Sequence, residues 1–551
     1  MKRIALLLAV CSGLILAAAC AGNLPFLATA PQPAKPVGAV SLPPQGTAGS
    51  PWWSDTVFYE AFVRSFYDSN GDGIGDIRGL IQKLDYLNDG NPNTTTDLGV
   101  TGLWLMPIQP AASYHGYDIT HYDQVNPQYG SLDDFKLLLK EAHRRGIRVV
   151  IDLVLNHTSD QNPWFVQAQN PSSSYHDWYV WGSSAHSGDP SWHKAPNGEY
   201  YYGFFGAGMP DLNYRNPAVT AKMEDVARFW LQDVGVDGFR LDAARYLIES
   251  GAAAADTSAT HAWLAQFYTF YKKLNPQAMT VGEVATYTST VATYTPGAQM
   301  DLAFDFDLAD ATVKSARLGG AEDVMDLLKR DTGWFPSGQY ASFLTNHDQD
   351  RFMSLARNDP QKGKVAAALL LTNPGVPFIY YGEEIGMLGM KPDESIRSPM
   401  EWSGGPNAGF TTGTPWEAVN PDYPTKNVAA ESADPGSLLS YYRELIRIRG
   451  EHEALREGSW IGLAASSPAV AAYLRAAPAE TALVICNLGK DPVSGLSLSL
   501  AKSGLSGRHA LLPILGAEKL PELEFNPSGG FAGYQPVPEL PAYTTLIYQL
   551  Q

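Results

Sequence analysis

The sequence predicts an α/β fold, namely a (β/α)8 barrel with a small inserted domain after its third strand and a C-terminal antiparallel β-sandwich. Three observations predict this architecture. Eight short apolar segments alternate with amphipathic stretches between residues 57 and 382. The connection after the third segment is too long for an ordinary strand-to-helix loop. From about residue 459 onward, apolar and polar side chains alternate, as they do in half-buried strands.

The eight apolar segments have the length and composition of buried parallel strands. Amphipathic stretches between them, such as 131–146 and 218–235, have helical spacing and end at glycine, as helices commonly do. Eight alternations of strand and helix predict a closed barrel. An open doubly wound sheet is the alternative, but it normally brings a glycine-rich phosphate loop, which the sequence lacks. The segments are 57–63, 101–107, 147–155, 236–241, 279–284, 301–306, 340–346 and 376–382.

Changes in composition divide the chain into domains. The stretch after the third strand is rich in aromatic residues, glycine and serine, which predicts a small domain inserted over one end of the barrel. The predicted parts are a signal peptide at 1–20, a Pro/Ala/Gly-rich tether at 21–50, the catalytic barrel at 51–156 and 217–457, the inserted domain at 157–216 and the C-terminal β-sandwich domain at 458–551.

The N-terminus indicates export. Lys2 and Arg3 precede an apolar segment, residues 4–20, that is too short for a convincing membrane span. Cys20 ends a run of small residues that resembles a bacterial lipoprotein cleavage site, so we expect a lipid anchor at Cys20, with plain secretion as the alternative. Cys11 also lies in the signal, which leaves Cys486 alone in the globular part and excludes an intramolecular disulfide there.

Composition restricts the classes of partner. The chain is 45% hydrophobic and 17% charged, which is typical of a globular protein. Its formal net charge is -18, and no basic cluster follows the first three residues, which argues against nucleic-acid binding. We expect a monomer that contacts a membrane only through the lipid anchor.

Polar side chains gather at the C-terminal ends of four predicted strands, the end where barrels hold their active sites. Arg240 and Asp242 point to the same face of the fourth strand because side chains alternate along a strand. An ordinary ion pair would explain these two residues alone. Convergence of three carboxylates is costly without a function, however. The residues are Asn156, His157, Arg240, Asp242, Glu283, His347 and Asp348.

These residues lie in four segments, "DLVLNH", "GFRLDAARY", "VGEV" and "TNHD", whose order and spacing resemble the signatures of the α-amylase family, glycoside hydrolase family 13. "MPDLN" at 209–213 and "KPDESIRSPMEW" at 391–402 resemble a subgroup intermediate between oligo-1,6-glucosidases and neopullulanases. Glu401 stands where that subgroup has Gln or Leu. The resemblance covers about residues 51–551 and implies a barrel enzyme acting on α-glucans.

The resemblance implies a retaining mechanism, in which two carboxyl groups flank the glycosidic bond. Asp242 would be the nucleophile, Glu283 the general acid and base, and Asp348 the group that stabilises the transition state. Arg240 would keep Asp242 ionised and oriented. The other implied substrate-binding residues are the stacking platform Tyr117, the hydroxyl donors His157 and His347, the amylase-like His115, and Asp118, from which exo-acting α-glucosidases grip the non-reducing end.

Residues 68–76, "DSNGDGIGD", resemble half of an EF-hand loop, with oxygens at positions 1, 3, 5 and 9 and glycine at position 6. Gly79 stands where the closing glutamate belongs, so this is no EF-hand, but the family resemblance implies one calcium site here. A metal-free Asx-Gly turn is the alternative. A second calcium, held partly by Asn156, is disfavoured because Arg245-Tyr246 replaces the Lys-His of amylases that have it. The implied ligands are Asp68, Asn70, Asp72, the Ile74 carbonyl and Asp76.

Together these features predict an exported, endo-acting α-1,4-glucan hydrolase, an α-amylase that binds one calcium ion. Ala243, directly after the implied nucleophile, resembles α-1,4-acting members, whereas α-1,6-acting oligoglucosidases usually have Val. An α-glucosidase, a neopullulanase or a glucan transglycosylase of the same family is the alternative. A non-catalytic glucan-binding lipoprotein is a further alternative, which the intact set of Asp242, Glu283 and Asp348 disfavours.

Overall fold

The computed structural model describes residues 44–47, 49–183, 189–336, 338–517 and 519–551. The predicted signal peptide, Cys11, Cys20 and most of the predicted tether lie outside the described residues. In the part of the chain that the structure describes, no helix is both long and apolar enough to cross a membrane.

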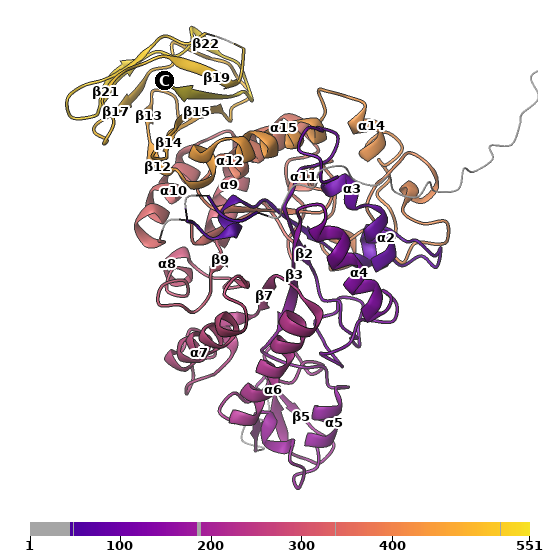
Figure 1. The fold of residues 1–551 in the computed structure, drawn as a ribbon. Helices are drawn as coiled ribbons and strands as arrows, with labels where there is room; N and C mark the ends of the chain where they lie inside the picture. Colours follow the sequence, from indigo (N-terminus) through magenta and orange to yellow (C-terminus); the bar gives the residue numbers. More distant parts are fainter. Residues whose placement is uncertain (1–43, 48, 184–188, 337, 518) are drawn as a thin grey trace, which may run out of the picture. The chain divides into compact units, whose positions relative to one another are not determined.

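Eight parallel strands close into a barrel in the order β1-β11-β10-β9-β8-β7-β3-β2. Figure 1 labels β2, β3, β7 and β9 among them. Seven of the eight predicted segments contain one of these strands, and the segment 236–241 covers all of β7 except its last residue, Asp242, so the predicted barrel is confirmed. Because every neighbouring pair is parallel, the C-terminal ends of all eight strands meet at one end of the barrel. The strands are β1 Phe58–Ala61, β2 Gly102–Leu105, β3 Arg148–Val154, β7 Gly238–Asp242, β8 Met279–Gly282, β9 Leu302–Phe304, β10 Tyr340–Ser342 and β11 Val376–Tyr380.

Aromatic side chains fill the interior of the barrel. The rings of Phe58 and Phe378 stack 4.4 Å apart, and Trp104 lies 5.4 Å from Phe304. These residues belong to one buried apolar cluster with Val150, Val281 and others. The barrel is therefore a packed core, and polar side chains at its C-terminal end lie on an apolar floor.

Sixteen α-helices occur in the described residues. The stretch predicted at 131–146 contains a helix that Ser131 and Asp134 open with a capping box. The stretch at 218–235 continues past its helix in a π-helical turn, Phe229–Val234, and ends at Gly235 with φ 98°. The helices are α1 Val63–Phe66, α2 Ile77–Gln82, α3 Leu84–Leu87, α4 Leu132–His143, α5 Pro163–Ala168, α6 Pro217–Arg228, α7 Ser258–Leu274, α8 Thr288–Val291, α9 Phe306–Leu318, α10 Glu322–Trp334, α11 Phe352–Leu355, α12 Pro360–Thr372, α13 Asp393–Ile396, α14 Val428–Ser432, α15 Leu438–Glu451 and α16 Glu453–Glu457.

A three-stranded antiparallel sheet lies in the long connection between β3 and α6. Its strands are β4 Trp181–Gly182, β5 Trp192–Lys194 and β6 Tyr200–Tyr202. An isolated bridge joins His157, just after β3, to Asp211 at the end of the connection. This bridge ties the inserted segment to the C-terminal end of the barrel.

The C-terminal region forms antiparallel sheets, as predicted. A five-stranded sheet, β12-β14-β15-β23-β19, and a three-stranded sheet, β13-β17-β21, enclose one apolar core that includes Leu474, Leu483, Leu498 and Phe531. Cys486, on β15, is buried as a free thiol on the other face of the five-stranded sheet, among the residues of the main hydrophobic core. The strands are β12 Ser459–Gly462, β13 Ala464–Ala465, β14 Val470–Ala476, β15 Thr481–Asn487, β16 Val493–Ser494, β17 Leu498–Leu500, β18 Gly507–His509, β19 Leu511–Leu515, β20 Leu523–Phe525, β21 Phe531–Tyr534, β22 Glu539–Leu540 and β23 Thr545–Leu550.

Candidate active site

A cavity of about 270 Å³ opens at the C-terminal end of the barrel strands. Asp242 ends β7, Glu283 follows β8 directly, and Asp348 lies in the loop after β10. Closure of the barrel therefore brings together three carboxyl groups that lie far apart in the sequence. The lining residues are His115, Tyr117, His157, Phe205, Met209, Asp242, Ala243, Glu283, Asp348, Asp393 and Arg397.

The Arg240 guanidinium joins three carboxylates beneath this cavity. Its Nη1 donates to Asp152 Oδ1 at 2.7 Å and to Asp242 Oδ1 at 2.6 Å. Its Nη2 donates to Glu283 Oε2 at 2.9 Å, and the Ala243 amide donates to the same oxygen at 2.9 Å. Arg240 is fully enclosed, so these ion pairs are strong constraints on the positions of Asp242 and Glu283.

One cation among three carboxylates leaves the cluster with excess negative charge. Burial raises the pKa of Asp242 well above its usual range, Arg240 opposes that rise, and Glu283 and Asp152 add to it. Burial likewise raises the pKa of Asp152. The cluster therefore favours holding a proton, and coupled carboxyl groups of this kind titrate as a unit.

A second charged network lies around His347, which has no exposed surface. Its Nδ1 lies 2.6 Å from Glu60 Oε1, and its Nε2 lies 3.1 Å from Asp348 Oδ2. Burial by itself lowers the pKa of His347, but Asp348 and Glu60 outweigh burial and raise it to about 10. Arg397 Nη2 also donates to Asp348 Oδ1 at 2.8 Å. Burial raises the pKa of Asp348, but His347 and Arg397 lower it well below its usual range.

The raised pKa of His347 predicts a pH dependence of stability. The unfolded chain releases this proton near pH 6.5, whereas the folded chain keeps it until about pH 10. The contribution of His347 is therefore complete below pH 6.5 and is lost as the pH rises to about 10, at no more than about 1.4 kcal/mol per pH unit. Denaturant unfolding of the wild type and of His347→Gln across this range measures the difference. Parallel pH curves for the two proteins would contradict the raised pKa.

Aromatic and imidazole rings form one wall of the cavity. The ring of Tyr117 stacks on His347 with centroids 5.4 Å apart, and its hydroxyl lies 2.7 Å from His347 Nε2. His157 is buried, and its Nδ1 lies 3.1 Å from Asn156 Oδ1. Burial lowers the pKa of His157 to about 4, so the ring is neutral near pH 7.

The contacts of Asn156 assign the tautomer of His157. The Asn156 amide nitrogen donates to the Tyr246 carbonyl at 2.8 Å and to Asp211 at 3.3 Å, so its Oδ1 faces His157 as an acceptor. In the neutral ring His157 Nδ1 then carries the proton, and Nε2, which has no hydrogen-bond partner in the part of the chain that the structure describes, is an acceptor. This differs from the donor role that the family resemblance implies for His157.

Asp118 lies near the cavity but does not line it. Its Oδ1 accepts hydrogen bonds from the Ser113 amide at 3.1 Å and from the Ser113 hydroxyl at 2.8 Å. The side chain therefore shapes its own loop. The structure brings the other predicted residues together, with Arg240 and His347 behind the lining side chains.

A model of the α-amylase catalytic domain matches residues 60–458 of the sequence. The chain belongs to the α-amylase family. The resemblance of its four signature segments to glycoside hydrolase family 13 is thereby confirmed, and the protein is a glycosidase of that family.

Members of the α-amylase family with different names are similar to this chain. It is 38% identical to α-amylase 3 of Dictyoglomus thermophilum over 448 residues, which cover 80% of this chain and 86% of that protein. It is 34% identical to the oligo-1,6-glucosidase of Parageobacillus thermoglucosidasius over 523 residues, covering 80% of this chain and 91% of that protein. The crystal structure of an α-amylase from H. orenii superposes with a TM-score of 0.79 at 40% identity, covering 90% of this chain and 99% of that one.

The side chains of residues 68–76, where the sequence predicts a calcium site, hydrogen-bond to the backbone of their own loop. Asp68 Oδ1 accepts from the amides of Asn70 and Gly71 at 2.9 and 2.7 Å, and Asp76 Oδ1 caps α2 through the Gly79 amide at 2.7 Å. Within the described residues, no group of three or more His, Cys, Asp or Glu side chains is arranged to hold a metal. The donor set is all oxygen, as calcium prefers, yet the same contacts also build a metal-free Asx turn.

Several residues of this α-amylase-family site were missed by sequence reasoning. Asp152 lies on the inward face of β3, and Glu60 lies on the inward face of β1. Each is a charged residue within an apolar strand, and this feature of the sequence could have identified both as site residues. Arg397 lies in the segment 391–402, in which the sequence drew attention to Glu401 and not to Arg397. Phe205, 41% exposed, comes from the inserted segment and lies 5.4 Å from the His157 ring. The sequence around Phe205 has no hydrophobic periodicity that would have indicated a position in the site.

Proposed function

We propose that this chain is a retaining, endo-acting α-1,4-glucan hydrolase that cleaves starch and maltooligosaccharides by double displacement. The observation that carries the proposal is the binding of Asp242 and Glu283 by one buried guanidinium, that of Arg240. Retaining glycosidases need a nucleophile and an acid held close together on either side of the glycosidic bond. The shared contact with Arg240 supports such a pair at the floor of the cavity.

The first step forms a covalent glycosyl-enzyme. Asp242 Oδ1 is bound by Arg240, so the other carboxylate oxygen attacks the anomeric carbon while the glycosidic C–O bond breaks. Glu283 Oε2 accepts from Arg240 and from the Ala243 amide, which leaves Oε1 to carry the proton that passes to the leaving oxygen. In the second step a water molecule gives its proton to Glu283 and attacks the anomeric carbon, which frees Asp242.

Asp348 and the rings beside it bind the sugar that is attacked. The ionised Asp348 accepts from sugar hydroxyls and stabilises positive charge in the oxocarbenium-like transition state. His157 Nε2 lines the same cavity as a free acceptor, and Tyr117 offers a ring face to the sugar C–H groups. These groups together support recognition of a glucosyl unit.

The linkage preference is tested at Ala243. This residue lines the cavity beside Asp242, and a larger side chain there narrows the space for the leaving sugar. We expect the wild type to prefer maltotriose to isomaltotriose and Ala243→Val to lower the ratio of their kcat/KM values by about 10-fold. Because Ala243 has φ 48°, Val also strains the backbone, so Ala243→Ser is the control and the Tm of each variant is measured. A wild-type preference for isomaltotriose would favour the oligo-1,6-glucosidase alternative.

Product analysis tests endo action. An endo-acting enzyme releases a spread of maltooligosaccharides from soluble starch early in the reaction, whereas an α-glucosidase releases glucose from the start. Hydrolysis of pullulan would indicate a neopullulanase, and transfer products at high maltotriose concentration would indicate a transglycosylase. Absence of any turnover would support the non-catalytic glucan-binding protein instead.

We also propose that residues 68–76 bind one calcium ion. A metal that binds only the folded state stabilises it by mass action, so excess chelator is expected to lower the Tm of the wild type by several degrees. Asp72→Ala should lower the Tm to a similar extent and abolish the response to chelator. The exposed residue Asp323, on α10, gives the control Asp323→Ala, which should keep that response. A Tm unchanged by chelator would favour the metal-free turn.

We further propose that the chain is exported as a monomer and anchored to the cell envelope by a lipid on Cys20. The charged and apolar start of the sequence supports export. Cys20→Ser is expected to release the enzyme into the medium, and release of the wild type would favour plain secretion.

A further inference from the structure

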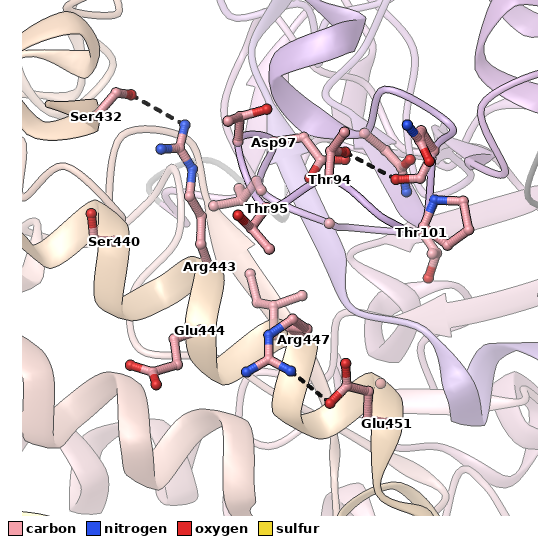
Figure 2. A pocket seen from close by; sticks show the side chains of 18 of the residues that line it. Thr94, Thr95, Asp97, Thr101, Ser432, Ser440, Arg443, Glu444, Arg447 and Glu451 are labelled. Atoms are coloured by element: carbon pink, nitrogen blue, oxygen red, sulfur yellow. Dashed lines mark hydrogen bonds and ion pairs between the residues drawn. The ribbon is translucent and has the colours of Figure 1, made fainter. Parts of the chain in front are cut away.

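A second cavity lies far from the carboxylates described above. It has a volume of about 670 Å³, more than twice the 270 Å³ of the catalytic cavity, and it lies between residues 88–101 and α15 (Figure 2). Residue Thr101 leads directly into the N-terminal end of β2. Since all barrel strands are parallel, this cavity is at the barrel end opposite to the catalytic one. Its volume is within the range of roughly 300–1,000 Å³ that is usual for small-molecule sites.

The helix side of this cavity carries charged groups of both signs. Arg443 Nη2 donates to Ser432 Oγ at 3.2 Å, and the Nε of the same guanidinium is buried with no hydrogen-bond partner among the described residues. Arg447 Nη1 donates to Glu451 Oε2 at 2.6 Å, one turn further along α15 (Figure 2). A buried donor without an acceptor is costly, which points to a ligand or water that accepts from Arg443.

The opposite side consists of small polar side chains with an acidic group among them. Figure 2 shows Thr94, Thr95 and Asp97 across the cavity from the two arginines. The apolar side chains of the wall are Pro92, Leu98, Ala433, Pro435 and Ile446. The walls therefore offer donors, acceptors and apolar patches together.

This mixture restricts the ligand class. Two arginines face three acidic groups, Asp97, Glu444 and Glu451, so the cavity is a poor site for a phosphate or another strong anion. The arginines equally disfavour a metal cation. Carbohydrate hydroxyls both donate and accept, and their C–H faces suit the apolar patches. The described lining residues include no aromatic ring, so hydrogen bonds must supply the affinity and binding will be weak.

We propose that this cavity is a second binding site, which holds a segment of α-linked glucan away from the catalytic carboxylates. The identity of the ligand as a glucan rests on the proposed function. A long substrate that is held at two places returns to the catalytic cavity more often, because the second contact raises its effective concentration. Short substrates gain nothing from such a site.

Affinity electrophoresis in gels that contain soluble starch tests the site in an Asp242→Asn background, where starch is not consumed. We expect the parent to be retarded, and Arg443→Ala to raise the apparent Kd about 10-fold, as loss of a charge-assisted hydrogen bond does. Thr95→Trp fills the cavity from an exposed loop position and serves as a second variant. Arg508→Ala, at an exposed arginine paired with Glu524, is the matched control and should migrate like the parent.

Kinetics separate this inference from the proposed function. With active Asp242, Arg443→Ala is expected to raise the KM for soluble starch several-fold and to leave kcat/KM for maltotriose unchanged. The inference is overturned if the parent is not retarded, or if Arg443→Ala and Thr95→Trp both migrate like it. Failure of the wild type to hydrolyse maltotriose would instead refute the proposed function, whatever the gel shows.

Discussion

Asp242→Asn is expected to reduce hydrolysis of soluble starch by about 10⁴-fold or more without unfolding the protein, because an amide does not form the covalent glycosyl bond. The fold should persist because Arg240 keeps Asp152 at 2.7 Å and Glu283 at 2.9 Å as partners. Steady-state rates measure the loss, and thermal unfolding curves check the fold.

The matched control for this variant is Asp323→Asn. The side chain of Asp323 is 50% exposed on α10 and forms an ion pair with Lys314 at the surface. This change should leave the starch rate near that of the wild type. If Asp242→Asn itself hydrolysed starch at nearly the wild-type rate with an unchanged unfolding midpoint, another residue would be the nucleophile.

Glu283→Gln is expected to lose about 10²- to 10⁴-fold in rate on starch, the usual contribution of a general acid. The loss should be much smaller for the first step on an aryl α-glucoside whose leaving group needs no proton. The glutamine oxygen can still accept from Arg240 and from the Ala243 amide, which hold Glu283 Oε2 at 2.9 Å, so the site should keep its shape.

Burst kinetics on the aryl glucoside provide the measurement, because they separate formation of the glycosyl-enzyme from its hydrolysis. Glu322→Gln, at an exposed position in the first turn of α10, is the control and should behave as the wild type on both substrates. Equal losses on starch and on the aryl glucoside would contradict the role of Glu283 as general acid.

The barrel strands could be predicted from the sequence because their signal is local. Each of the eight apolar segments is short, buried on both faces and bounded by loops, and each coincides with one barrel strand to within one residue at its ends or encloses it. The signal for α4 is local too, because its capping box consists of Ser131 and Asp134. Period and capping depend on neighbours within a few residues, so a sequence reveals them without knowledge of the fold.

The side chains that face the substrate were predictable only in part. The alternation of side chains along β7 placed Arg240 and Asp242 on one face, and in the structure Arg240 Nη1 lies 2.6 Å from Asp242 Oδ1. Asp118, in contrast, lies in a segment that resembles the family pattern but turns its carboxylate to Ser113. Its hydrogen-bond partner five residues earlier depends on the bend of the loop, which has no periodic signal.

By itself, the sequence determined the α/β class, the eight barrel strands, the C-terminal antiparallel sheets and the family to which the chain belongs. Only the tertiary structure decided which charged side chains form ion pairs or hydrogen bonds with one another. The register of β3 against β7 places Asp152 beside Arg240, and barrel closure brings Glu60 of β1 to His347 after β10. Contacts of this kind depend on strand register and on closure of the barrel, which bring together residues that lie hundreds of positions apart. Whether a segment forms a strand depends instead on a few adjacent side chains.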